Sequence, residues 1–497
     1  MEKVNNIKVG KRNILMDNVS IKKLNEVYNE IICEPSIAYE LKDYFTFSVP
    51  GAKFTPAYKN KVWDGNIYLY NPLTRLLYGG LNSYVEEFCR SRNYVVDYTN
   101  DLSSDEFSLK EAKDFVEKLK PTMQPRDYQM EAFVHAVRER RALLLSPTSS
   151  GKSFIIYLLM RYYSARTLII VPTTSLVSQL ASDFADYGFE SDKFVHRIYA
   201  GQDKQTNKPI TISTWQSIYK MDKKYFEQFD VVIGDEAHLF KAKSLITIMT
   251  KLDKCKYRFG FTGTLDGTST NKLVLEGLFG AVRVVTTTSE LIENKYAADF
   301  KIKAIVLSYS DEIRQLVSKM NYQSEMDYIV RLEARNRFVR NLALSLEGNT
   351  LLLFQFVDKH GKGLFETLKK EAGDRPVHYV SGSVDADERE EIRKIVETQS
   401  NAIIVASYGT FSTGINIKNL HNVIFSSPTK SRIRNLQSIG RGLRRSETKT
   451  ESTLYDISDD MSWKTKKNFT LLHFMERIKI YNEEKFPYKI YKVSINQ

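Results

Sequence analysis

Residues 142–160 read ALLLSPTSSGKSFIIYLLM. The apolar run Leu143–Leu145 predicts a buried strand, and the run Phe154–Met160 predicts an apolar helix. A loop of mostly small residues, Ser146–Ser153, joins the two. A strand followed by a loop and a helix is the repeating unit of α/β domains, so this stretch predicts an α/β fold.

The loop has the residue types that phosphate binding requires. Its small side chains let backbone N–H groups approach phosphate oxygens, and we expect Ser150 and Gly151 to line this cradle. The helix N-terminus adds about half a positive charge. Lys152 would reach the β- and γ-phosphates of ATP, and Ser153 would ligate Mg²⁺. Because Ser146 occupies the first glycine position of the pattern GxxxxGK[ST], an ordinary strand-to-helix turn is the alternative interpretation.

Apolar runs of strand length alternate with helical stretches on both sides of this loop. Short apolar runs separated by helices are typical of a parallel sheet covered on both faces. The pattern occurs from about 125 to 298 and again after 300, so it predicts two tandem parallel-sheet domains. The expected strands are Ala142–Leu145, Thr167–Val171, Ile210–Ser213, Val231–Ile233, Arg258–Phe261, Leu351–Phe356, Val377–Val380, Ala402–Ala406, Asn422–Phe425 and Thr453–Tyr455.

Two acidic residues follow one of these strands. Val231–Ile233 leads through Gly234 into Asp235 and Glu236. Carboxylates at the end of a buried strand are costly unless they serve a cation or a polar network. Beside a phosphate loop, Asp235 would hold Mg²⁺ and Glu236 would polarise the attacking water. The alternative is a helix N-cap formed by Asp235, with a solvated Glu236.

Composition limits the class of protein and its partners. The chain has 72 Lys and Arg against 60 Asp and Glu, a net charge of +12, which favours polyanionic partners. Cys33, Cys89 and Cys255 are far apart, so neither a disulfide framework nor a zinc site is expected. The first residues do not resemble a signal peptide, and no apolar run approaches the ~18 residues of a membrane span. We therefore expect a soluble, cytoplasmic protein without membrane contact.

The first hundred residues predict a small α/β module. Lys53, Lys59 and Lys61 lie among aromatic residues that include Trp63. Lysines supply phosphate contacts and aromatic rings can stack on bases, so these four residues are candidate contacts to nucleic acid. A small aromatic core with a solvated basic face explains the same pattern equally well.

The expected domains are residues 1–105, 106–298 and 299–497, and a chain of 497 residues fits about three domains. The charged helical stretch 311–346 is interpreted as the crossing between the second and third domains and the opening of the third. Near the C-terminus, a helix over 469–481 is expected to pack on the third domain through Leu472, Met475 and Ile478.

The phosphate loop and the sequence Asp235-Glu236-Ala237-His238 resemble motifs I and II of superfamily 2 helicases. Ser149 and Ser438 depart from the usual residues of motifs I and VI, and no role is assigned to Ser438. The other motifs follow in the family's order: Arg126–Gln129 for the Q motif, Val171–Thr173 for Ia, Ser213–Gln216 for Ib, Thr262–Thr264 for III, Ser412–Asn416 for V and Gln437–Arg444 for VI.

The resemblance implies two RecA-like domains with ATP and Mg²⁺ between them. Motif IV is expected in the second of these domains, together with motifs V and VI. Lys152, Asp235 and Glu236 would act from one wall and the arginine fingers Arg441 and Arg444 from the other. The resemblance also implies that the nucleotide is contacted by Arg126, Gln129 and Gln437. The ATP state would be coupled to nucleic acid through His238, Thr262, Thr264 and Gly414. The nucleic-acid backbone would be held by Pro172, Thr173 and Thr214.

The whole chain, with its basic N-terminal module, resembles the recombination and repair helicases of T-even bacteriophages. This implies a monomeric motor in the bacterial host cytoplasm that acts on branched or duplex DNA, single-stranded DNA and RNA–DNA hybrids. Its expected reactions are Holliday junction branch migration, fork regression, and D-loop and R-loop unwinding in recombination, repair and replication restart. An RNA helicase, the motor subunit of a restriction enzyme, and an annealing or clamp protein with a regulatory ATP site are the alternatives.

Overall fold

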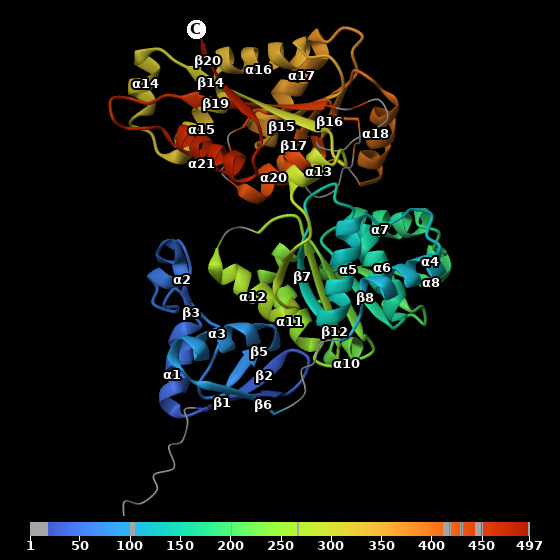
Figure 1. Ribbon diagram of the computed structural model, residues 1–497. Coiled ribbons are helices and arrows are strands. Elements are labelled where there is room, and N and C mark those ends of the chain that lie inside the picture. Colours follow the sequence, from blue (N-terminus) through green and yellow to red (C-terminus); the bar gives the residue numbers. More distant parts are fainter. Residues whose placement is uncertain are drawn as a thin grey trace, which may run out of the picture.

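The structure is a computed structural model in which three sheet-based units follow one another along the chain (Figure 1). Among the described residues, no helix is both long and apolar enough to cross a membrane. The structure describes residues 18–99, 105–199, 201–265, 268–382, 384, 386–410, 417, 419–427, 429, 431–442, 449 and 451–495.

The N-terminal module is a four-stranded mixed sheet in the order β5-β2-β1-β6. A separate hairpin, β3–β4, carries two short helical turns and projects from the module (Figure 1). We call this projection, residues 46–68, the tip. The elements are β1 Asn18–Lys23, β2 Tyr28–Ile32, α1 Pro35–Tyr44, β3 Thr46–Ser48, η1 Ala52–Phe54, α2 Pro56–Lys59, β4 Asn66–Tyr68, β5 Leu76–Tyr78, η2 Gly79–Leu81, α3 Asn82–Arg92 and β6 Val95–Tyr98.

The first RecA-like domain is a seven-stranded parallel sheet in the order β13-β7-β12-β11-β8-β10-β9. The five expected strands are all present in it. Its strands are β7 Arg141–Leu145, β8 Thr167–Val171, β9 Val195–Ile198, β10 Ile210–Thr214, β11 Val231–Asp235, β12 Tyr257–Thr262 and β13 Val282–Val284. One face of the sheet is covered by α4 Leu109–Leu119, α5 Asp127–Glu139, α6 Lys152–Tyr163 and α7 Thr174–Asp186. The other face is covered by α9 Trp215–Ile218, α10 Lys223–Phe226, η3 Ala237–Lys241, α11 Lys243–Lys251 and α12 Ser269–Phe279. The short helix α8 Ser191–Phe194 precedes β9.

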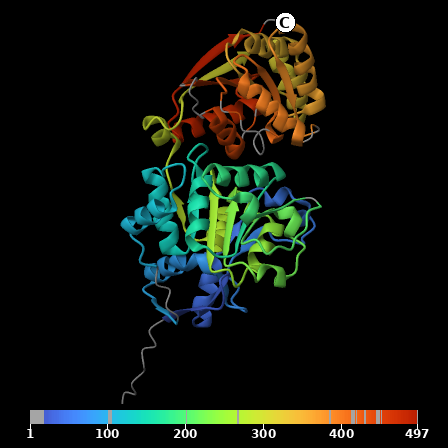
Figure 2. The same ribbon diagram turned by 90° about the vertical axis from the view of Figure 1, so that its right-hand side faces the viewer.

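The second RecA-like domain is another seven-stranded parallel sheet, in the order β16-β17-β15-β18-β19-β14-β20. Figure 2 shows it stacked above the first. Its strands are β14 Asp299–Ser308, β15 Thr350–Phe354, β16 Val377–Val380, β17 Ile403–Ser407, β18 Asn422–Phe425, β19 Glu451–Asp460 and β20 Tyr488–Ser494. Its helices are α14 Asp311–Val317, α15 Tyr322–Arg331, α16 Glu333–Ser345, η4 Val357–Gly361, α17 Lys362–Glu371, α18 Ala386–Thr398, α20 Arg432–Gly442 and α21 Phe469–Glu483.

The chain crosses between the two RecA-like domains earlier than the sequence pattern predicts. The short helix α13, Thr288–Glu293, lies between the sheets, and β14 already pairs with β19 of the second sheet. The interpretation of 311–346 as the crossing is therefore wrong, since this stretch belongs to the second domain as α14, α15 and α16.

The N-terminal module is fixed to α12 of the first RecA-like domain. The Tyr84 hydroxyl donates to Glu276 Oε2 at 2.6 Å, and Glu276 is only 3% exposed. Gly80 packs so closely that a Cβ there would lie 1.9 Å from the Glu276 carbonyl oxygen. Arg141 Nη2 also donates to the Glu26 carbonyl at 2.6 Å. Because the module shares a hydrophobic core with this face of the domain, the two form one packed unit.

Candidate active site

The phosphate loop connects the end of β7 to the start of α6. Two of its residues, Ser149 and Gly151, have left-handed φ angles of 73° and 76°. Gly151 is required, because a Cβ there would also lie 2.5 Å from Gln129 Nε2. Ser146, in the first glycine position of the pattern, braces the loop with its Oγ 2.5 Å from Ser150 Oγ. The departure from the usual motif therefore has a structural role.

Several groups around the loop suit a nucleotide. α6 has 12 residues and begins at Lys152, so its first backbone N–H groups face the loop. The Lys152 ammonium donates to the Ser146 carbonyl only at 3.5 Å. Ser149 Oγ and Thr264 Oγ1 are buried without a hydrogen-bond partner in the described structure. Buried polar atoms normally have partners, so these atoms fit a site that takes a phosphate or its bound water.

Asp235 ends β11 beside Glu236, which has a left-handed φ of 52°. Burial raises the pKa of Asp235 to about 6, the Glu236 carboxylate adds to the rise, and the Lys152 ammonium opposes it. The Glu236 backbone N–H donates to Asp235 Oδ1 at 2.9 Å. A carboxyl that is held with a raised pKa next to a second carboxylate is suited to binding a cation.

His238 joins motif II to motif III. Its Nδ1 lies 3.0 Å from Thr262 Oγ1 and 3.3 Å from Glu236 Oε2. The Thr262 hydroxyl donates to the Thr264 carbonyl at 2.9 Å, so Thr262 Oγ1 accepts from His238 Nδ1–H. A change at Glu236 can thus reach the motif III loop through its contact with His238 and the hydrogen bonds of His238 and Thr262.

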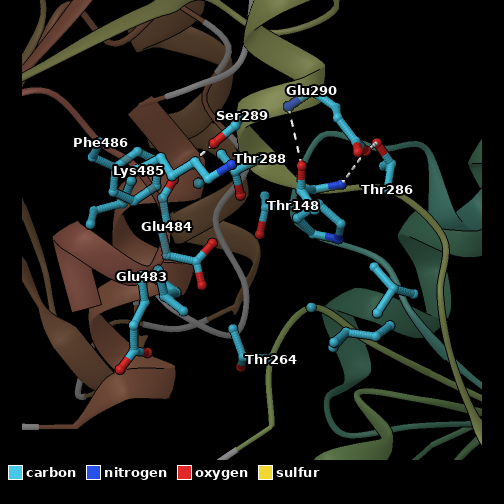
Figure 3. A pocket seen from close by; sticks show the side chains of 18 of the residues that line it. Thr148, Thr264, Thr286, Thr288, Ser289, Glu290, Glu483, Glu484, Lys485 and Phe486 are labelled. Carbon is cyan, nitrogen blue, oxygen red and sulfur yellow. Dashed lines mark hydrogen bonds between the residues drawn. The ribbon is translucent and has the colours of Figure 1, made fainter. Parts of the chain in front are cut away.

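Helix α20 of the second RecA-like domain reaches this site. Gln437 Nε2 donates to Glu236 Oε2 at 3.5 Å. Gly440 faces the loop, since a Cβ there would lie 2.4 Å from Thr148 Cβ. A cavity of about 450 Å³ lies between the domains and is lined by Thr148 and Thr264, the linker residues Thr286–Glu290 and the residues at the end of α21 (Figure 3).

The second RecA-like domain forms the other side of this site, and the described residues include only a portion of it. Arg441 follows Gly440 in α20, but its side chain is outside the described portion. Arg444 and Gly414 lie outside the described residues. Their roles as arginine finger and coupling residue stay predictions.

The Q motif is bonded to the phosphate loop. Gln129 Oε1 accepts the Arg126 backbone N–H at 2.9 Å, and its Nε2 donates to the Ser150 carbonyl at 2.9 Å. Gln129 is only 4% exposed. Its amide thus ties α5 to the loop, and a direct contact with a nucleotide base stays a prediction.

The predicted Mg²⁺ ligand Ser153 lies in the first turn of α6, where its Oγ is 2.8 Å from the Tyr187 hydroxyl. Burial raises the pKa of Tyr187 to about 12, so this hydroxyl is neutral near pH 7. No sequence signal points to this partner, because Tyr187 ends the distant helix α7.

Motifs Ia and Ib lie together at the ends of β8 and β10. Gln216 Nε2 donates to the Pro172 carbonyl at 3.5 Å, and Thr173 precedes α7. The Thr214 side chain is buried and its Oγ1 lies 2.9 Å from Ser217 Oγ. Any contact that Thr214 makes with nucleic acid would therefore come mainly from its backbone.

The predicted residues of the tip fall into two groups. Lys53, Lys59 and Lys61 are exposed. Trp63 is half-buried, and its indole N–H donates to the Asn66 carbonyl at 2.7 Å, so it braces the tip. The most exposed apolar side chains of the tip are Phe54 and Val62, at 73% and 82%.

Three family models match successive stretches of the chain. They are the N-terminal domain of DNA helicase UvsW over residues 18–99, the res subunit of type III restriction enzymes over 122–267, and the helicase conserved C-terminal domain over 333–446. The last two lie on the two RecA-like sheets.

Two of the similar proteins are a phage helicase and an archaeal translocase. The chain is 37% identical over 492 residues to the ATP-dependent DNA helicase uvsW of Enterobacteria phage T4, covering 94% of this chain and 97% of that protein. It is 25% identical over 372 residues to the DNA 3'-5' translocase XPB2 of Sulfurisphaera tokodaii, covering 68% of this chain and 82% of that protein.

Solved structures show the same architecture. The crystal structure of T4 UvsW matches with a TM-score of 0.51 and 34% identity, covering 96% of this chain and all of that one. The DNA-bound restriction-modification enzyme LlaBIII matches with a TM-score of 0.56, covering 82% of this chain and 34% of that one. At 16% identity, the second match shows the fold alone.

Two RecA-like sheets with helicase motifs in the cleft between them define an ATP-dependent helicase. Within that class, the chain belongs to the family of the bacteriophage helicase UvsW, whose N-terminal module it shares.

Proposed function

We propose that this helicase is a DNA motor that remodels branched DNA in recombination, repair and replication restart. Its reactions would be branch migration of Holliday junctions, fork regression, and unwinding of D-loops and R-loops, by a monomer in the bacterial host cytoplasm. The observation that carries the motor mechanism is the contact of α20 with Thr148 and Glu236, because it makes one site from two domains.

The residues of the first domain are proposed to hold MgATP. Bound Mg²⁺ neutralises phosphate charge, which is most of what phosphoryl transfer requires. Asp235 and Ser153 would hold the ion, partly through water, and Lys152 would hold the phosphates. Glu236 would orient the attacking water and accept its proton. Ser150 and Gly151 would supply the backbone of the cradle.

Arg441 of α20, and Arg444 beyond the end of this helix, are proposed to complete the site when the domains close. Gln437 already contacts Glu236, and Arg441 follows one helical turn later. Guanidinium groups of Arg441 and Arg444 would stabilise the transferring phosphoryl group, and a positioned arginine finger is worth roughly 10³–10⁵ in rate. Hydrolysis then requires closure, and His238, Thr262, Thr264 and Gly414 would pass the state of the site to strand contacts at Pro172, Thr173 and Thr214.

The tip is proposed to meet the DNA where the two strands separate. The tip contains three lysines and a single acidic residue, Asp64, so its net positive charge favours a polyanion. Lys53, Lys59 and Lys61 would contact phosphates, while Phe54 and Val62 would press on the terminal base pair. Stacking a base on an aromatic side chain is worth about 1–3 kcal/mol, comparable with the ~1.4 kcal/mol needed to separate a single base-pair step.

A substrate series tests this proposal. ATP hydrolysis and strand separation would be measured with forked DNA, a four-way junction, an R-loop, plain duplex DNA and single-stranded RNA, using the full chain and Lys152→Ala as the inactive control. We expect the branched substrates to be remodelled fastest, and Lys152→Ala to be inactive on all. Stimulation by RNA alone would indicate an RNA helicase, and ATP-independent pairing of strands would indicate an annealing or clamp protein.

A further inference from the structure

The linker between the two RecA-like domains places one tyrosine beside the Q motif. Tyr296 follows the end of α13, where Lys295 adopts a left-handed φ of 57°. The backbone N–H groups of Tyr296 and Ala297 both donate to the Leu291 carbonyl, at 2.8 and 2.9 Å. These bonds fix the direction of the Tyr296 side chain, which remains 40% exposed.

The Tyr296 ring packs on the guanidinium group of Arg126. The centre of that group lies 4.3 Å from the ring centroid. Arg126 Nη1 also donates to the Tyr128 hydroxyl at 2.8 Å, and the Tyr128 and Tyr296 ring centroids are 6.1 Å apart. Arg126 thus has the Tyr296 ring of the linker against its guanidinium group and one N–H bonded to the hydroxyl of Tyr128 of α5.

This cluster is bonded to the phosphate loop. The Tyr128 hydroxyl donates to the Ser150 carbonyl at 2.9 Å, the same carbonyl that accepts from Gln129. A nucleotide whose phosphates lie on the loop would therefore have its base near Arg126. The Gln129 amide is nearly buried and engaged by the backbone, whereas the planar groups of Arg126, Tyr128 and Tyr296 are partly exposed here.

We propose that Tyr296 is a positioning residue for the nucleotide base, an inference that rests on the proposed ATP site. Its ring fixes the guanidinium plane of Arg126, and this plane stacks on the base. A planar guanidinium stacks well on flat rings and gains from being held in place before binding. A purine offers more stacking area than a pyrimidine, so Tyr296 favours ATP over CTP.

The contact of Tyr296 with Arg126 also connects the base with the linker between the two RecA-like domains. Tyr128 packs against the hydrophobic core that contains Leu291, Ala297 and Phe300. In the linker helix, Ser289 Oγ donates to the Glu484 carbonyl at the end of α21, at 2.9 Å (Figure 3). Stacking of the base on Arg126 therefore constrains the segment that joins the two domains.

The test compares Tyr296→Ala with Tyr296→Phe, and with Tyr39→Ala as a control at an exposed tyrosine of α1. KM and kcat would be measured for ATP and CTP with single-stranded DNA in excess. Calorimetry would measure the affinity for both nucleotides independently of turnover. For Tyr296→Ala we expect KM for ATP to rise about three- to thirty-fold, the range of a cation–π contact, with kcat kept and the preference for ATP over CTP reduced.

Tyr296→Phe should restore the preference, since the ring and not the hydroxyl contacts Arg126, and Tyr39→Ala should behave as the unchanged chain. A purely structural role in the linker would change kcat, or change ATP and CTP equally, and would overturn the inference. An unchanged ATP-to-CTP ratio in both turnover and binding would also overturn it, while leaving the proposed motor intact. Absence of ATP hydrolysis by the unsubstituted chain would instead remove the proposed function and, with it, this inference.

Discussion

Gly440 of the second RecA-like domain lies against Thr148 of the first, so closely that a Cβ at position 440 would be 2.4 Å from Thr148 Cβ and 2.6 Å from its Oγ1. The two residues lie on opposite sides of the cleft that holds the candidate active site. Gly440→Ala should keep α20 away from the phosphate loop. We expect kcat of DNA-stimulated ATP hydrolysis to fall on the order of tenfold or more, while ATP affinity changes little.

Gly363→Ala is the matched control for this substitution. Gly363 lies in α17, and no described heavy atom lies within 4 Å of a Cβ built there. That variant should keep full activity and gain up to about 1 kcal/mol of stability from its higher helix propensity. Normal kcat in Gly440→Ala would mean that the catalytic geometry is not the close approach seen here.

Asp235 gives a pH-dependent prediction. Its pKa of about 6 in the folded chain exceeds the value of about 4 expected on unfolding, so its ionisation weakens folding as pH rises through this window. Asp235→Asn should therefore stabilise the magnesium-free protein above pH 6 by on the order of 1 kcal/mol or more. The gain should shrink below pH 6 and vanish near pH 4, as measured by urea unfolding.

Asp230→Asn, at the exposed position just before β11, is the control for this effect. It should show no comparable gain between pH 6 and 8. A destabilised Asp235→Asn at pH 8 would contradict the raised pKa. Asp235→Asn should also lose ATP hydrolysis, since the same carboxylate is proposed to hold Mg²⁺.

His238 is expected to couple hydrolysis to movement. In His238→Ala, Glu236 loses its link to Thr262, but both carboxylates and the phosphate loop remain. ATP hydrolysis should fall only a few-fold, while base pairs separated per ATP should fall on the order of tenfold. Parallel ATPase and unwinding assays measure this ratio, with the partly exposed His196→Ala as control. An unchanged ratio would show that coupling takes another route.

The tip gives a prediction on strand separation. Phe54→Ala combined with Val62→Ala removes its most exposed apolar surface and leaves the lysines in place. Unwinding of a forked duplex should slow about five- to tenfold, while ATP hydrolysis on single-stranded DNA is unchanged. Leu73→Ala, 87% exposed on the same module but outside the tip, should have no effect. Equal unwinding by the double variant would exclude a role of the tip in separating the strands.

The bond between Tyr84 and Glu276 gives a prediction on stability. Tyr84→Phe leaves a nearly buried carboxylate oxygen without this donor, which should cost about 1–3 kcal/mol in the free energy of unfolding. Tyr39→Phe, at an exposed hydroxyl, should change stability by less than about 0.5 kcal/mol. A separate early transition of the module in Tyr84→Phe would contradict a single packed unit.

The fold is predictable where burial alone shapes the sequence. β8 and β15 are buried along their full length, and their uninterrupted apolar runs mark them as strands of a parallel sheet. β14 escapes prediction because its first half alternates exposed Lys301 and Lys303 with buried residues, so it lacks that signal. The missing strand also explains why the predicted crossing between the domains is misplaced.

The C-terminal helix shows a second limit. The helix packs on the second RecA-like domain as predicted, with Ile478 against its core, but the prediction for Leu472 and Met475 is wrong, since both are more than 40% exposed. The buried face carries Phe474, Ile480 and Tyr481 together with Arg477, which is paired with Asp456 at 2.8 Å. A pattern of apolar residues cannot predict a helix that is anchored by a buried ion pair.

The sequence predicts a set of residues for the site, and the structure places Lys152, Asp235 and Glu236 near one another, while their catalytic roles stay predictions. Motif order identifies Lys152, Asp235 and Glu236, because phosphate chemistry demands these types at the ends of strands. The bracing of the loop by Ser146 and the stacking of Tyr296 on Arg126 depend on distances that no local spacing encodes.

The packing of the N-terminal module on α12 joins the tip to the first RecA-like domain and not to the second. Since α12 follows the motif III loop and carries the module rigidly, the tip shares every displacement of the first RecA-like domain. In the proposed mechanism, closure of the cleft would move the second RecA-like domain relative to the tip and the first RecA-like domain together. Each ATP cycle would then pull the duplex towards the tip. The step size and the position at which base pairs separate would both depend on the packed unit of the N-terminal module and the first RecA-like domain.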